Sequence, residues 1–155
     1  MNHLISPRGT KQLRKARFSQ PNNIYFITSN TKNRQAIFTD FRLACKAIQG
    51  FTEKGRLQDS QLLCWVLMPD HAHWLIQLGA EKSLSSLVGS MKASATRQLR
   101  LQGFTKPVWQ SGFYDHALRK EDDVVNIARY IVANPIRAGL VKSVRNYPYW
   151  DAVYL

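Results

Sequence analysis

The chain has 155 residues, a length that fits one domain and suffices to bury a substantial core. Hydrophobic residues make up 45% of it and charged residues 21%, which excludes a disordered or low-complexity chain. Its 22 Lys and Arg residues against 10 Asp and Glu residues give a net charge of +12, which no fold requires and which points to an anionic partner.

Nucleic acid is the leading candidate for that partner, and a membrane surface is the second. No apolar run approaches the roughly 20 residues that a membrane-spanning helix needs, and the N-terminus lacks the apolar core of a signal peptide. Cys45 and Cys64 are too few and too isolated for a disulfide framework or a cysteine-based zinc site. We therefore expect a cytoplasmic protein whose cysteines act as small buried hydrophobic residues.

The chain begins with a basic arm, residues 1–20, that contains no acidic residue. Such a segment cannot build a core, so it is either a solubilising tail or an arm that binds nucleic acid. We favour binding, because clustered cations neutralise phosphates. The cations concerned are Arg8, Lys11, Arg14, Lys15 and Arg17.

The first regular elements in the sequence are a strand and a helix. Residues 24–28 follow a Pro-Asn-Asn turn and are all β-branched or aromatic, which predicts a strand. Apolar residues then recur at helical spacing from Phe41 to Phe51, which predicts a helix. Thr39 or Asp40 can cap that helix at its N-terminus.

Two apolar runs follow with only a turn between them. Residues 62–68 are a near-continuous apolar run that ends at Pro69-Asp70, which predicts a buried strand and a tight turn. Residues 71–78 form the next predicted strand. The two runs are therefore expected to pair in antiparallel fashion, with two histidines at the start of the second strand.

A second helix is predicted from Ser83 onward, because apolar residues again lie on one stripe. Lys92 and Arg97 lie off that stripe. Basic residues on the outer face of a helix are often only solvated, but the high net charge makes both residues candidate phosphate contacts.

The remaining elements complete a mixed pattern. Residues 113–118 can form a short strand, and the acidic residues 121–123 then open a third helix, where the helix dipole favours negative charge. That helix is expected to end near Asn134, because Pro135 disfavours α geometry at the residue before it. Residues 146–155 form an aromatic tail that we expect to pack across the body, with base stacking as the alternative. The order of elements predicts an α+β fold with helices on an antiparallel sheet.

His71 and His73 are the first candidates for chemistry. Side chains alternate along a strand, so the two imidazoles project from one face and can converge on one ion, while Ala72 and Trp74 point away. Such a pair is by itself more often an incidental half-buried pair than a metal site. A further ligand would favour the metal site.

Tyr130 and Asn134 are the second pair of candidates, because residues four apart share one face of a helix. The simpler interpretation makes Tyr130 a core aromatic residue and Asn134 a helix terminus. The combination of a basic chain, paired histidines and a tyrosine with a polar residue one turn later instead favours metal-assisted attack on a phosphodiester.

Three segments resemble those of a known family. Residues 68–74 (MPDHAHW) resemble the HUH motif (His, hydrophobic, His) of single-tyrosine transposases, and residues 129–141 (RYIVANPIRAGLV) resemble the tyrosine helix and its exit. Residues 108–119 (VWQSGFYDHALR) are similar to the intervening segment of the REP-associated branch, which acts on short extragenic palindromes. The resemblance extends from about Arg17 to Trp150.

The resemblance implies a fold and a set of roles. It implies a ferredoxin-like antiparallel sheet with flanking helices over residues 21–145. It places a divalent ion, Mg²⁺ or Mn²⁺, on His71 and His73, and makes Tyr130 the nucleophile that becomes attached to a 5′ phosphate. Relatives commonly have a glutamine as third ligand one turn after the tyrosine, where this chain has the shorter Asn134.

The resemblance also implies a bacterial, nucleoid-associated protein and a partner. The expected partner is single-stranded or hairpin DNA with REP-like palindromes, bound by a monomer without an obligate protein partner. His116 and Arg119 lie in the branch-like segment and become candidate DNA contacts, although His116 also suits a structural role beside the sheet.

Two other functions remain open at this point. A non-catalytic protein could hold structured DNA or RNA on a ferredoxin-like sheet by stacking bases on aromatic residues such as Tyr25, Phe26 and Trp74. A metal phosphodiesterase that uses activated water would need the histidines but not Tyr130.

Overall fold

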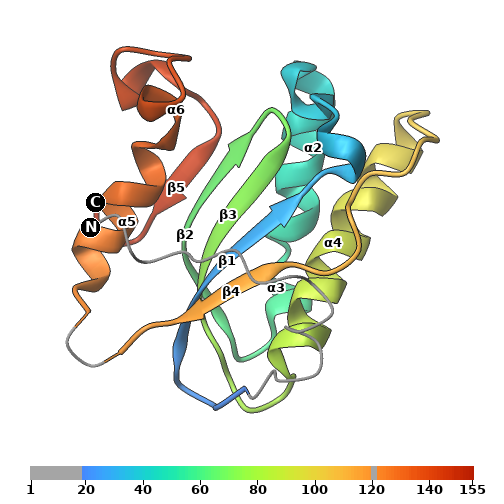
Figure 1. Cartoon of the computed structure of the whole chain (residues 1–155). Helices are drawn as coiled ribbons and strands as arrows, with labels where there is room; N and C mark the ends of the chain where they lie inside the picture. The colour runs from blue at the N-terminus through green and yellow to red at the C-terminus, as the bar shows by residue number, and fades with distance from the viewer. Residues whose placement is uncertain (1–18, 120–121) are drawn as a thin grey trace.

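The computed structural model describes residues 19–119 and 122–155, and in these ranges it contains one five-stranded sheet with the order β4-β1-β3-β2-β5. Each pair of neighbouring strands is antiparallel. The chain order β1, α2, β2, β3, α4, β4 together with the strand order β4-β1-β3-β2 is the ferredoxin-like arrangement, so the predicted α+β fold is confirmed (Figure 1). The strands are β1 Ile24–Asn30, β2 Gln61–Met68, β3 His71–Gln77, β4 Tyr114–Ala117 and β5 Trp150–Ala152.

Helices α2 (Phe41–Phe51) and α4 (Leu84–Leu101) begin where the sequence predicts. The Asp40 side chain accepts a hydrogen bond from the Leu43 amide, and the Ser83 side chain accepts one from the Ser86 amide. A Cβ atom at Gly50 would lie 2.5 Å from the Cα atom of Ala95, so glycine is required for the close contact between the two helices.

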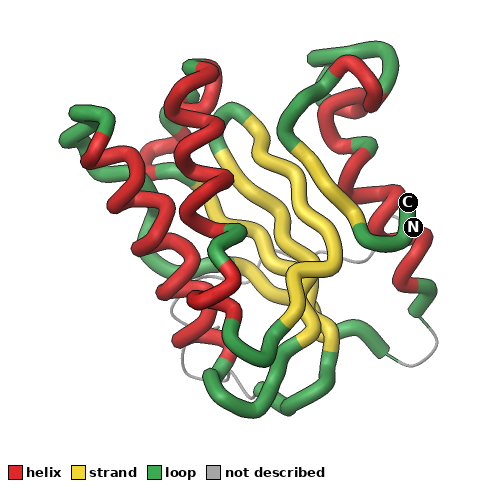
Figure 2. The backbone as a smooth tube through the Cα atoms, turned by 180° about the vertical axis from the view of Figure 1, so that it is seen from behind, coloured by secondary structure: helices red, strands yellow, loops and turns green. Residues whose placement is uncertain are grey.

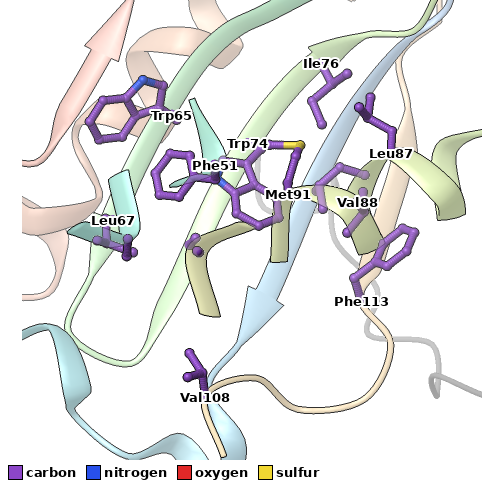
Figure 3. Packing of buried hydrophobic residues seen from close by; sticks show 14 of the residues in the cluster. Phe51, Trp65, Leu67, Trp74, Ile76, Leu87, Val88, Met91, Val108 and Phe113 are labelled. Atoms are coloured by element: carbon purple, nitrogen blue, oxygen red, sulfur yellow. The ribbon is translucent and has the colours of Figure 1, made fainter. Parts of the chain in front are cut away.

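The two helices cover one face of the sheet (Figure 2). Their apolar sides bury Trp74 together with Phe51, whose ring centroid lies 5.3 Å from that of Trp74 (Figure 3). Ala72, Trp74 and Ile76 of β3 all face this core, as strand alternation requires. The opposite face of the sheet is thereby left for His71, His73 and Leu75.

Helix α5 (Val124–Val132) packs on that opposite face, against β2 and β5. Its residues Ile127, Ala128 and Ile131 are buried beside Leu75 and Phe26. The helix that carries the candidate tyrosine and the strand face that carries the candidate histidines therefore belong to the same layer of the molecule.

The structure departs from the sequence prediction around Pro135. Helix α5 ends at Val132, and a short helix α6 (Asn134–Arg137) begins two residues later, with the proline in its first turn. Proline is accepted there because the first amides of a helix have no intrahelical partner. The proline therefore starts a new turn, which brings Arg137 back toward Tyr130.

The C-terminal segment also differs from the expected tail, because it contributes strand β5 to the edge of the sheet. The Tyr147 hydroxyl donates a hydrogen bond of 2.5 Å to the Leu67 carbonyl, which fixes the approach to that strand. The remaining short elements are α3 Lys54–Leu57, η1 Lys32–Arg34, η2 Ile37–Thr39 and η3 Val144–Asn146.

Across the described residues, no helix combines the length and apolar character needed to cross a membrane. Cys64 is buried and Cys45 is half-buried, and neither forms a disulfide. The basic residues of the arm, from Arg8 to Arg17, lie outside the described residues.

Candidate active site

The two histidines lie side by side at the start of β3. His71 pairs with Asn30 of β1 and Met68 of β2, and His73 pairs with Thr28 of β1, so both are held by neighbours on either side. Their ring centroids are 4.8 Å apart. The His71 side chain is 15% exposed and His73 is 8% exposed, so the pair is mostly buried rather than on the open surface.

Each ring is fixed through its Nδ1 atom. His71 Nδ1 lies 2.7 Å from Asp70 Oδ1, and His73 Nδ1 lies 2.9 Å from Thr28 Oγ1. A histidine that binds a metal through one ring nitrogen usually donates the N–H of the other to an oxygen. The two oxygens here therefore leave Nε2 of each ring as the atom through which it would bind an ion.

Burial keeps both imidazoles in the neutral form that can coordinate. Burial, together with smaller contributions from the charges of His71 and Arg137, lowers the pKa of His73 to about 3. Burial also lowers the pKa of His71, although the hydrogen bond and charge of Asp70 oppose this. At neutral pH the lone pairs are thus available without deprotonation.

Asp70 is itself held in place by the β1–α2 connection. Arg34 Nε donates to Asp70 Oδ2 at 3.0 Å, and the amide and hydroxyl of Thr31 both donate to the Asp70 carbonyl. Burial raises the pKa of Asp70, but the hydrogen bonds from His71 and Arg34 outweigh this and hold it below its usual value. The residue is therefore a carboxylate that orients His71.

Arg34 occupies an unusual backbone conformation. Asn33 and Arg34 both have φ 55, in the left-handed region that costs an L-residue about 1 kcal/mol or more. The conformation turns the Arg34 side chain back toward Asp70 and Asn30, whose Oδ1 accepts a bond of 3.3 Å from Nη1. The strain is thus located beside the histidine pair.

Tyr130 lies near the end of α5 and is 36% exposed. The guanidinium carbon of Arg137 lies 3.8 Å from the centroid of its ring, a cation–π contact between α6 and α5. The same guanidinium is close enough to His73 to lower the pKa of that imidazole. Helix α6 and the turn before His71 lie at the same end of the molecule (Figure 1). Arg137 therefore connects the candidate nucleophile to the histidine pair.

Asn134 begins α6, one turn after Tyr130, and is half-buried. In the part of the chain that the structure describes, no group of three or more His, Cys, Asp and Glu side chains could hold a metal ion. A divalent ion on the histidine pair would therefore need a further ligand of another type, such as an amide oxygen, and Asn134 stays a prediction for that position.

The other candidate DNA contacts are spread over the molecule. Lys92 Nζ donates to the carbonyls of Gln110 and Gly112, both at 2.8 Å, so its ammonium group holds the segment before β4. Arg97 lies on α4, on the face of the sheet away from the histidines, 3.9 Å from Glu53. These positions favour structural roles, and their contacts with DNA stay predictions.

His116 and Arg119 lie closer to the site. His116 pairs with Phe26 across β4 and β1, and the Phe26 and His73 ring centroids are 5.2 Å apart. His116 Nε2 lies 4.0 Å from Asp122 Oδ2, and Arg119 is exposed just before the two undescribed residues. Both remain candidate DNA contacts on the histidine side of the sheet.

Sequence reasoning missed four residues of the site: Thr28, Arg34, Asp70 and Arg137. The pairing of the first strand with the histidine strand could have identified Thr28, because directly opposite residues share a face. Helical spacing does not identify Arg137, because it follows Tyr130 by seven residues across the break between α5 and α6. No sequence signal identifies Arg34 among its basic neighbours.

Comparisons with known proteins assign the chain to a family. Residues 19–134 match the model of the family described as "Transposase IS200 like". The REP-associated tyrosine transposase of Escherichia coli K12 is 30% identical over 129 residues, a match that covers 81% of this chain and 73% of that protein. The solved structure of a REP-associated tyrosine transposase bound to a REP hairpin is 28% identical, with a TM-score of 0.68 over 86% of this chain and 79% of the other.

The family match covers most of the chain, and its residues 19–134 include His71, His73 and Tyr130. The chain therefore belongs to the IS200-like transposase family and, within it, to the REP-associated tyrosine transposases.

Proposed function

We propose that this protein cleaves and rejoins single-stranded DNA at hairpin-forming palindromic repeats through a covalent 5′-phosphotyrosine on Tyr130. The observation that carries the proposal is the arrangement of two neutral histidines, each fixed through Nδ1, beside an arginine that contacts the ring of Tyr130. A relative whose structure was solved with a REP hairpin supports hairpin DNA as the ligand.

The chemistry proposed is a direct exchange of phosphate esters. The Tyr130 oxygen attacks the scissile phosphorus, a bond from that oxygen to phosphorus forms, and the bond to the 3′-oxygen breaks. The phenolic proton is lost from the nucleophile, and the leaving 3′-oxygen takes up a proton to become a hydroxyl. A 3′-hydroxyl can later reverse the attack, so rejoining needs no nucleotide cofactor.

The residues fit a divalent ion. Mg²⁺ or Mn²⁺, held by His71 and His73 with Asn134 as a further oxygen ligand, would supply stabilisation of the charge that develops on the phosphoryl oxygens. Asp70 and Thr28 would keep the two rings directed at a common point, since each holds an Nδ1 atom. We further propose that the protein acts as a monomer, with its own tyrosine and histidines in one site.

The test uses radiolabelled hairpin oligonucleotides taken from repeats near the gene, incubated with the protein and MnCl₂ and separated under denaturing conditions. We expect a shifted protein–DNA adduct and a free 3′-hydroxyl fragment, both lost in excess chelator. Tyr130→Phe should bind the hairpin and form neither product. Binding without cleavage by the wild-type protein would favour a non-catalytic binder, and cleavage by Tyr130→Phe would favour activated water.

A further inference from the structure

Two arginines flank the histidine pair without belonging to it. Arg34 comes from the β1–α2 connection, and Arg137 comes from α6, at the far end of the chain from Arg34. Arg34 bonds to Asp70, whose other carboxylate oxygen lies 2.7 Å from His71 Nδ1, and Arg137 stacks on the ring of Tyr130. Helix α6 and the turn before His71 lie at the same end of the molecule, so two cations from separate elements lie beside the candidate site (Figure 1).

Arg34 has donors that its contacts do not consume. Its Nε bonds to Asp70 and one Nη1 proton bonds to Asn30, whereas a guanidinium carries five N–H donors. Its side chain is 53% exposed. The ion pair with Asp70 therefore fixes the side chain in place and leaves part of the fork directed at solvent, as a preformed anion site requires.

Arg137 is held by its stack on Tyr130 and also keeps donors for an anion. Its planar guanidinium stacks on the Tyr130 ring at 3.8 Å, an arrangement that the compact ammonium of a lysine reproduces poorly. Stacking engages the face of the guanidinium and leaves its N–H groups at the edge. Those donors are available for an anion lying between Tyr130 and the histidines.

The balance of charges beside the histidine pair also favours an anion. Asp70 is the carboxylate that contacts both His71 Nδ1, through Oδ1, and Arg34 Nε, through Oδ2. Two guanidinium groups against one carboxylate leave an excess of positive charge before any metal ion binds. A phosphodiester carries one negative charge and several acceptor oxygens, which matches that excess.

We propose that Arg34 and Arg137 form a two-arginine clamp for the scissile phosphate, and that Arg137 also positions Tyr130 for its attack. The clamp rests on the proposed function, because it assumes that a phosphodiester binds beside the histidine pair. It assigns Arg34 a role beyond its ion pair, and it gives a reason for the strained backbone at Asn33 and Arg34.

The clamp is tested by removing charge from each partner in turn. Arg34→Gln and Arg137→Gln are compared with the wild-type protein on two hairpin oligonucleotides, one with a normal scissile phosphate and one with an uncharged methylphosphonate there. We expect each variant to lose on the order of 100-fold in single-turnover rate on the phosphate. On the methylphosphonate the loss should fall below about threefold, because the charge that the arginine neutralises is gone.

A matched control removes an equal charge elsewhere. Arg56 lies on α3, on the other face of the sheet, in an ion pair of 3.6 Å with Glu53. Arg56→Gln should behave as the wild-type protein on both oligonucleotides. Equal losses on the two linkages for Arg34→Gln or Arg137→Gln would show that the arginine does not act on the phosphate charge and would overturn the clamp.

Binding gives a second readout that does not depend on cleavage. In the Tyr130→Phe background we expect the charged linkage to bind more tightly than the methylphosphonate, and Arg34→Gln should reduce this difference, because one of the two cations is removed while Arg137 remains. An unchanged difference would contradict the clamp. Failure of the proposed function has another signature, namely no adduct with the wild-type protein on the normal phosphate.

The conservative variant Arg137→Lys separates the positioning role of Arg137 from the role of its charge. Arg137→Lys keeps the charge but loses the planar stack on Tyr130. We expect Arg137→Lys to restore the preference for the charged linkage while the saturated cleavage rate stays at least tenfold below that of the wild-type protein. Arg34→Lys should recover most of the rate. Full recovery by Arg137→Lys would contradict positioning through the ring.

Discussion

The hydroxyl of Thr28 lies 2.9 Å from Nδ1 of His73, across the pairing of β1 with β3. This contact explains how a histidine with 8% exposure can keep a fixed orientation without a carboxylate beside it. For His73 to bind an ion through Nε2, its Nδ1 must carry the proton and the Thr28 oxygen must accept it. The Thr28 hydroxyl can therefore accept the Nδ1 proton of the tautomer that the proposed metal site needs.

Removing the Thr28 hydroxyl should weaken metal use without disturbing the fold. Thr28→Val is nearly isosteric, and we expect the Mn²⁺ concentration for half-maximal adduct formation to rise by about 10- to 100-fold. Thr28→Ser keeps the oxygen and should stay within about threefold of the wild-type protein. A Thr28→Val protein with an unchanged Mn²⁺ dependence would show that the hydroxyl does not orient a ligand.

The three proposed ligands should differ in importance. His71→Ala and His73→Ala each remove an imidazole from the proposed metal site, and we expect cleavage to fall by orders of magnitude. Asn134→Ala should lose less, because water can replace one oxygen ligand. Isothermal titration calorimetry with MnCl₂ measures how much each substitution weakens metal binding. An Asn134→Ala defect as large as that of the histidine variants would instead mark Asn134 as an irreplaceable ligand.

Cys64 should resist thiol reagents in the folded protein. Burial raises its pKa from its usual value near 9 to about 12, so little thiolate exists at pH 8. The half-buried Cys45 should react with Ellman's reagent first, and Cys64 should react only when denaturant is added. Cys45→Ser provides the control in which all of the fast phase disappears. A fast phase that remains in Cys45→Ser would contradict the burial of Cys64.

The same shift gives a stability prediction of known sign. Above pH 9 the unfolded chain loses the Cys64 proton while the folded chain retains it until about pH 12. The free energy of unfolding should therefore fall as the pH rises through this window. Cys64→Ala should reduce the slope of that fall in urea titrations at pH 9 to 11. An unchanged slope would show that the thiol makes no contribution.

The basic arm should contribute affinity rather than chemistry. Deletion of residues 1–17 removes the five cations from Arg8 to Arg17 and should flatten the dependence of log affinity on log salt by about two to four units. Some cleavage should survive at low salt, because Tyr130 and the histidines remain. An unchanged salt slope with unchanged affinity would show that the arm is only a tail.

The sequence predicted the elements whose burial is periodic. Alternation in β3 placed His71 and His73 on one face and Trp74 on the other, because the pleated backbone of a strand sends successive side chains to opposite faces. The sequence analysis missed β5, because a strand of three residues is too short to show an alternation of apolar and polar residues. The pairing of β5 with β2 is a tertiary contact that composition does not encode.

The candidate site was predictable only where its chemistry is local. The His71–His73 and Tyr130–Asn134 spacings are visible in the sequence, whereas the contacts of Arg34 are not. Arg34 reaches Asp70 across 36 positions through a left-handed turn formed by two residues other than glycine. Local propensity argues against such a turn, and the surrounding hydrogen bonds stabilise it.

The most direct test of the central claim is the identity of the residue that carries DNA. After incubation with a hairpin oligonucleotide and MnCl₂, the adduct is digested with nuclease and trypsin and analysed by tandem mass spectrometry. Trypsin cleaves after Arg129 and Arg137, and the released peptide, residues 130–137, contains Tyr130 as its only tyrosine. We predict a nucleotide phosphate on that side chain, absent without divalent metal. A nucleotide on any other residue, or cleavage products with no modified peptide, would contradict the account.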